Sequence, residues 1–93
     1  MAARSGMITV TTAGTAVAGP ATPVGRIFRL TAHPDNTDTV WVGNDGAGDV
    51  SSANGSPLNA RDSVIVEVVR SLDELYFDAD VSGEKIAWLA VAL

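Results

Sequence analysis

The stretch Arg26-Ile27-Phe28-Arg29-Leu30-Thr31-Ala32 alternates its side chains, so that Phe28, Leu30 and Ala32 share one apolar face. A side-chain period of two is typical of a β-strand with one buried face, whereas a helix repeats every 3.6 residues. Further short β-branched runs follow, bounded by Pro, Asn, Asp and Gly, at 39–42, 63–69, 75–81 and 85–91. This spacing predicts an all-β fold, a small antiparallel β-sandwich or partly open barrel of about 7–8 short strands.

Length and composition indicate one packed domain. The chain has 93 residues, of which 46% are hydrophobic and 18% charged, and a domain of this size buries roughly 60–65% of its unfolded surface. The absence of cysteine excludes disulfides and thiolate chemistry. No run approaches the roughly 20 apolar residues of a membrane span, and the first residues lack the apolar core of a signal peptide. We therefore expect a soluble protein.

The net charge of −5 is unevenly distributed along the chain. Residues 1–30 contain Arg4, Arg26 and Arg29 and no acidic residue, whereas residues 31–93 contain three basic residues and all eleven acidic ones. An acidic body is repelled by phosphate backbones, so we expect no nucleic acid among the partners, and nothing suggests a membrane. The basic first third suits an acidic protein surface.

Residues 1–24 differ in composition from the rest. A strand can form near Met7–Thr12, but residues 13–24 are a mixture of Ala, Gly, Thr and Pro with little to bury. We interpret 1–24 as an N-terminal arm with a possible edge strand, and 25–93 as the β-sandwich domain. The arm is expected to order on a partner by adding a strand through Ile8, Val10 and Thr12. A first edge strand followed by a loose loop is an equally weighted alternative.

Turn residues divide the remaining chain. The stretch 33–38 predicts a hairpin into Val40 and Val42, and two loops at 43–49 and 51–57 are expected to flank a very short strand near Val50. Ser71-Leu72-Asp73-Glu74 has the spacing of a capping box and predicts a single helical turn. In the strand that follows, Leu75, Phe77, Ala79 and Val81 are expected to point inward, and Tyr76, Asp78 and Asp80 outward.

The last strand is apolar on both faces. Ile86, Trp88 and Ala90 form one face, and Ala87, Leu89, Val91 and Leu93 form the other. Such a strand either lies centrally under another layer or presents its second face to another chain. We expect the chain to self-associate through Leu89, Val91 and Leu93.

Reaction chemistry is not evident in the sequence. His33 is the single histidine, and with no cysteine a zinc site is not expected. Asp45 and Asp49 lack the alternating spacing of a calcium loop, and Asp78 and Asp80 have no evident cleft partner. We therefore expect no enzyme, no catalytic residue, no metal ligand and no cofactor. Trp41 could belong to the core or form a ligand platform.

Several segments together resemble small tailed-phage virion proteins. The resemblance runs roughly over residues 8–91 and is carried by structural turns. Its segments are Leu30-Thr31-Ala32-His33-Pro34-Asp35-Asn36-Thr37-Asp38-Thr39-Val40-Trp41-Val42-Gly43, then Val50, Asn54-Gly55-Ser56-Pro57-Leu58, Ser71-Leu72-Asp73-Glu74-Leu75-Tyr76-Phe77 and Gly83-Glu84-Lys85-Ile86-Ala87-Trp88-Leu89. Where family members have a Pro-Gly-Glu-Ser type of turn, this chain has Asn59-Ala60-Arg61-Asp62-Ser63.

The resemblance implies a β-sandwich carried on the virion and made in the host cytoplasm. It implies a capsid decoration (cement) protein that binds the major capsid protein between subunits and forms a homo-oligomer on the particle. The alternative is a tail- or fibre-associated module that binds a receptor or carbohydrate through Trp41, Tyr76 and the loops at 44–56. The partner-binding residues expected from all these arguments are Ile8, Val10, Thr12, Arg26, Arg29, Trp41, Leu89, Val91 and Leu93.

Overall fold

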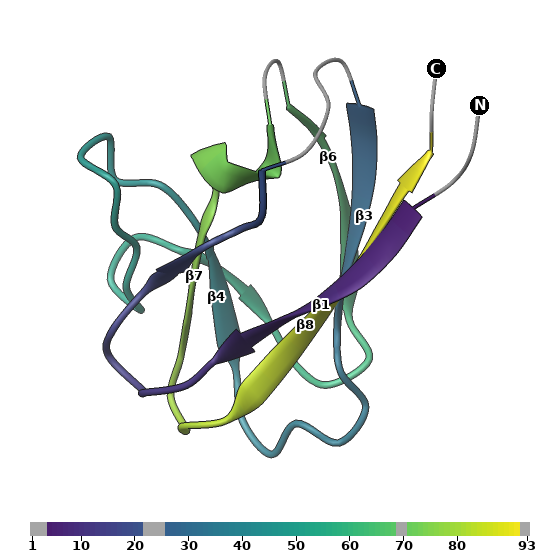
Figure 1. The fold of residues 1–93 in the computed structure, drawn as a ribbon. Helices are drawn as coiled ribbons and strands as arrows, with labels where there is room; N and C mark the ends of the chain where they lie inside the picture. Colours follow the sequence, from purple (N-terminus) through teal and green to yellow (C-terminus); the bar gives the residue numbers. More distant parts are fainter. Residues whose placement is uncertain (1–3, 22–25, 69–70, 92–93) are drawn as a thin grey trace.

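The computed structural model describes residues 4–21, 26–68 and 71–91 and shows two four-stranded antiparallel sheets packed face to face (Figure 1). The first sheet has the order β1 (Arg4–Val10), β8 (Glu84–Val91), β3 (Arg26–Ala32), β6 (Ser63–Val68). The second has the order β2 (Val17–Ala18), β7 (Tyr76–Ala79), β4 (Val40–Gly43), β5 (Ser56–Leu58). The predicted all-β sandwich is therefore confirmed. No helix in these ranges is long and apolar enough to cross a membrane.

The core lies between the two sheets and follows the period of two. Phe28, Leu30 and Ala32 of β3 are fully buried, as the alternation predicted. The ring of Trp88 packs beside Phe28, with ring centroids 6.0 Å apart. The other buried apolar residues of this cluster are Ile8, Val10, Val40, Val42, Leu58, Leu72, Phe77, Ala79, Ile86 and Ala90.

Strand β1 is part of the sandwich. Its residues pair with β8 from Arg4 opposite Ala90 to Val10 opposite Glu84, and Ile8 and Val10 are buried in the core. The interpretation of this segment as an arm that orders only on a partner is thus wrong for β1, and the alternative of a first edge strand holds. The reason is that Ile8 and Val10 alternate on the inner face of the strand, so that β1 supplies two side chains to the core.

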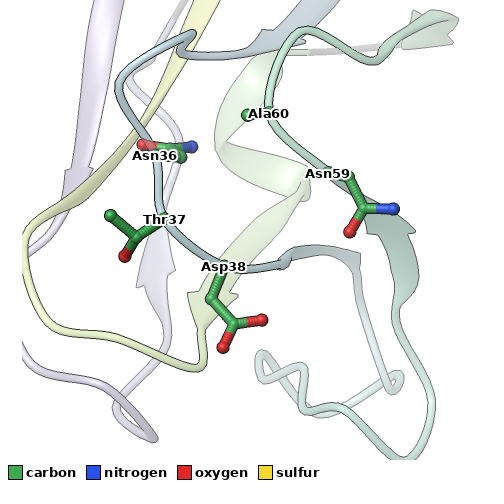
Figure 2. A pocket seen from close by; sticks show the side chains of 5 residues that line it. All are labelled: Asn36, Thr37, Asp38, Asn59 and Ala60. Carbon is green, nitrogen blue, oxygen red and sulfur yellow. The ribbon is translucent and has the colours of Figure 1, made fainter.

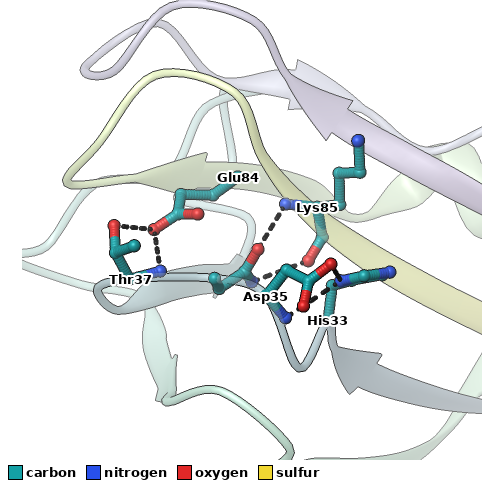
Figure 3. Close-up of polar contacts among 6 residues, drawn as sticks. His33, Asp35, Thr37, Glu84 and Lys85 are labelled. Carbon is teal, nitrogen blue, oxygen red and sulfur yellow. Dashed lines mark hydrogen bonds and ion pairs between the residues drawn. The ribbon is translucent and has the colours of Figure 1, made fainter.

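The connection from β3 to β4 crosses between the sheets, so the predicted hairpin is wrong. Asn36 donates from its side chain to the Lys85 carbonyl at 2.8 Å and accepts the Lys85 N–H at 2.9 Å, which holds the loop against β8. Glu84 then accepts the N–H groups of Thr37 and Asp38, each at 2.8 Å, and Figure 3 shows its contact with Thr37. These contacts with β8 turn the chain away from β3 toward the second sheet.

Two smaller expectations need correction. Val50 is buried, but it lies in a loop, and the short strand is β5. Val81 is 40% exposed because β7 ends at Ala79. Asp78 lies on the outer side of β7 as expected, but it is buried there, in a turn from which Gly14 donates its N–H to the carboxylate at 2.9 Å. The predicted helical turn is present as the 3₁₀ helix η1 (Leu72–Glu74).

Candidate functional site

Among the described residues, large apolar side chains are exposed on the outer face of the first sheet. Met7, Ile65 and Leu89 are 49%, 70% and 42% exposed. They belong to β1, β6 and β8, and each follows or precedes a residue whose side chain points into the sandwich, so all three point outward. Exposed apolar surface on a sheet face often marks an interaction site. We call it the outer apolar face, made of Met7, Ile27, Ile65, Ala87 and Leu89.

The strand register places a positive charge inside the outer apolar face. Arg29 of β3 lies directly opposite Leu89 on one side and Ile65 on the other. Its guanidinium donates a hydrogen bond to the Ser63 hydroxyl at 3.2 Å. The face therefore combines apolar area with one arginine, whose remaining donors suit a carboxylate or a carbonyl on a partner.

The structure distributes the predicted partner-binding residues over several places. Leu89 and Arg29 lie on the outer apolar face, whereas Ile8 and Val10 are buried and available to no partner. Thr12 is exposed beyond the end of β1. Only the backbone of Arg26 and Val91 is described, and Leu93 lies outside the described residues.

Met7, Ile27 and Ile65 were missed by the sequence interpretation. Ile65 alternates with Val64 and Val66, and this pattern predicts an outward side chain at Ile65 if the two valines face inward. Met7 could be placed outward only once Ile8 and Val10 were known to be buried. Alternation therefore gives the direction of each side chain, but it does not by itself show which outward side chains form an exposed apolar face.

Trp41 lies on the outer side of the second sheet. It is half-buried, and its indole N–H donates to the Asp80 carboxylate at 3.0 Å. It lies opposite Asp78 and Pro57 on the neighbouring strands. Its one polar group is thus already engaged, and only part of the ring is open to a ligand.

In the acidic loop at 43–49, side-chain oxygens accept hydrogen bonds from nearby backbone N–H groups. Asn44 Oδ1 accepts the N–H of Gly46 at 2.7 Å, and Asp45 Oδ1 accepts the N–H of Ala47 at 2.8 Å. Asp49 Oδ1 accepts the N–H of the next residue at 2.8 Å. Within the described ranges no group of three or more His, Cys, Asp or Glu side chains is placed to hold a metal ion. These oxygens shape a turn.

A shallow, open depression of about 300 Å³ lies where the loops after β3 and β5 meet (Figure 2). Its lining residues are Asn36, Thr37, Asp38, Asn59 and Ala60. The backbone of Thr37 and Asp38 is held by Glu84, and Asn59 Oδ1 accepts the Thr39 hydroxyl at 2.9 Å. The Thr37 hydroxyl donates to Glu84 Oε1 at 3.2 Å, but that oxygen already accepts two backbone N–H groups, and Asp38 is the one carboxylate of the lining, so we assign the depression no chemistry.

Comparison with known proteins identifies no relative of this chain. No family model matches the chain, and neither the curated proteins nor the solved structures contain a significant match. The described residues define a small all-β sandwich whose first sheet exposes large apolar side chains on its outer face.

Proposed function

We propose that this chain is a non-enzymatic virion structural protein that decorates a phage capsid and stabilises it by binding between major capsid subunits. The observation that carries the proposal is the outer apolar face, where Met7, Ile65 and Leu89 are exposed on one sheet surface. The resemblance of the turn segments to small phage virion proteins supports the same function.

The outer apolar face suits a broad protein surface better than a small ligand. It is the surface of a sheet, with large side chains at β1, β8 and β6 and Arg29 between them. Burial of apolar area contributes about 25 cal/mol per Å², so a flat partner that covers the whole face gains most. On a symmetric shell, neighbouring copies also hold each contact at high effective concentration, so modest single contacts suffice.

The direct test is the composition of particles. Particles released by the strain that encodes the chain are purified on a density gradient, and the peptides of this chain are quantified by mass spectrometry against the major shell protein. We expect a fixed stoichiometric ratio across the particle peak. Peptides that remain with soluble protein and are absent from the particle peak would overturn the proposal.

A tail- or fibre-associated receptor- or carbohydrate-binding module is the second candidate. The half-buried ring of Trp41 is the observation that favours it. The two candidates differ in their response to Trp41→Ala. Loss of host adsorption with unchanged head stability supports the tip module, whereas loss of head stability after disruption of the outer apolar face supports decoration.

A further inference from the structure

Strand β6 forms an edge of the first sheet, with β3 on its inner side (Figure 1). The Ala32 N–H donates to the Asp62 carbonyl at 2.9 Å, just before β6 begins. In an antiparallel pair, residues alternate between those bonded to the neighbour and those that point away. Counting on from Asp62, the even-numbered residues of β6 bond to β3. The N–H and C=O groups that point to the free edge therefore belong to Ser63, Ile65 and Glu67.

Within the described residues, this edge lacks the proline, lysine or short length that commonly prevents strand pairing. Exposed edges are commonly blunted by proline, lysine or short length, and in the second sheet β5 contains Pro57 and β2 has only two residues. Strand β6 has six residues, Ser-Val-Ile-Val-Glu-Val, with a single charge at Glu67. Ile65 is 70% exposed, and the inward side chains of Val64 and Val66 are only half-buried. An additional strand would cover all of these side chains.

We propose that two copies of this chain pair through β6, antiparallel and about a two-fold axis at Ile65, to form one continuous eight-stranded sheet. In this register Ile65 lies opposite Ile65 of the second copy. Ser63 lies opposite Glu67 of the second copy, and Val64 lies opposite Val66. The inference does not rest on the proposed function.

The register follows from the geometry of the edge. Residues directly opposite each other in an antiparallel pair point to the same face, so Ile65 must meet an outward residue and Val64 an inward one. With the axis at Ile65, the N–H and C=O of Ser63, Ile65 and Glu67 all find partners on the second copy. On the inner face, Val64 and Val66 of the two copies form an unbroken apolar row.

Charge complementarity favours the same register. Arg29 reaches toward the free edge and donates to the Ser63 hydroxyl at 3.2 Å. Glu67 of the second copy lies opposite Ser63, and this brings its carboxylate beside the Arg29 guanidinium. Within the described residues neither Arg29 nor Glu67 has an ion-pair partner. Because the dimer is two-fold symmetric, the ion pair between Arg29 of one copy and Glu67 of the other forms twice.

Strand pairing at the other edge of the first sheet would bury less additional apolar surface on the inner face. Its strand, β1, already has its inward residues Ile8 and Val10 buried. Pairing β6 of one copy with β1 of the next would also be head-to-tail and would leave free edges at both ends, which leads to open filaments. Pairing β6 with β6 closes the assembly at two copies.

The test is the mass of the full chain in solution, measured by sedimentation velocity over a concentration series. We expect a dimer for the wild type and a monomer for Ile65→Pro, because proline removes an N–H that points to the free edge and leaves the bonds to β3. The matched control is Met7→Pro, which removes a free-edge N–H from the opposite edge strand on the same face. We expect that variant to remain dimeric.

A charge exchange tests the register and does not depend on tolerance of proline. Arg29→Glu and Glu67→Arg each place like charges together across the axis, and we expect each to weaken the dimer about tenfold or more. The double variant exchanges the charges, and we expect it to restore dimerisation. A monomeric wild type would overturn the proposal. So would concentration-dependent polymers that both proline variants abolish, or a double variant as weak as the single ones.

Discussion

The carboxylate of Glu84 accepts the backbone N–H of Thr37 at 2.8 Å, although 47 positions separate the two residues in the sequence. The same oxygen accepts the Asp38 N–H at 2.8 Å and the Thr37 hydroxyl at 3.2 Å. Glu84 is buried at the start of β8. One side chain thus fixes the loop that carries the chain from the first sheet to the second.

Loss of this acceptor should destabilise the fold. We expect Glu84→Leu to lower the free energy of unfolding by about 2 kcal/mol or more, because partly buried N–H groups lose their partner. Glu84→Gln keeps a neutral acceptor and should cost less. Urea unfolding measures both values. The neighbouring Lys85→Leu is the control, since the Lys85 side chain is exposed, and an equal loss there would contradict the role of the carboxylate.

Gly6 and Trp88 lie directly opposite each other on β1 and β8. A Cβ at Gly6 would approach Trp88 Nε1 to 2.6 Å, so the ring would have to move from its place beside Phe28. We expect Gly6→Ala to cost about 1–3 kcal/mol. The same change in a Trp88→Leu background should cost much less, and thermal unfolding of the four proteins measures this coupling. Additive losses of unfolding free energy would show that the Trp88 ring can move aside at little cost.

Neighbouring residues of β1 test whether this strand belongs to the core. Ile8 points inward and is buried, whereas Thr9 is exposed on the opposite face. We expect Ile8→Ala to cost about 2–4 kcal/mol in unfolding free energy, and Thr9→Ala to change it by about 0.5 kcal/mol or less. Circular dichroism during urea unfolding gives both values. Equal and small effects of the two substitutions would show that β1 is only loosely attached and contributes little to the core.

Alternation and turn chemistry predicted the sandwich because both are local. The inward set of β3 and the helical turn at 72–74 follow from neighbouring residues alone. The crossing after β3 depends on Glu84, and the burial of Asp78 depends on Gly14, 64 positions away. Alternation predicts that Ile65 points outward, but the position of β6 at the edge of a sheet comes only from its pairing with β3. Such pairings are not encoded in any short stretch, so these parts of the fold and of the candidate site could not be predicted.

The loop at 43–49 should be insensitive to chelators. The oxygens of Asn44, Asp45 and Asp49 that shape it accept backbone N–H groups. We expect thermal unfolding curves with calcium and with excess EDTA to coincide. A drop in Tm of several degrees on EDTA addition, reversed by calcium and abolished by Asp45→Ala, would reveal a cation site in this loop.

Leu89 and Val81 form a matched pair for testing the outer apolar face. Leu89 is 42% exposed at the centre of that face, and Val81 is 40% exposed in the turn after β7. Because their exposed fractions are similar, an aspartate should perturb folding similarly at either position. Only Leu89→Asp places a charge against the surface that we propose to contact the shell.

We expect Leu89→Asp to weaken binding of the purified protein to undecorated particles by at least about tenfold, the equivalent of about 1.4 kcal/mol, since a buried leucine contributes about 1.5–3 kcal/mol. Val81→Asp should bind like the wild type. Cosedimentation with particles at increasing protein concentration measures the affinity, and thermal unfolding checks both folds. Leu89→Asp should still form the β6 dimer through backbone pairing, because Leu89 lies on β8 and not on the edge strand, although the new carboxylate opposite Arg29 should reduce the attraction of Arg29 for Glu67 of the second copy. Equal binding by the two variants would remove the outer apolar face from the capsid contact and leave the dimer edge unaffected.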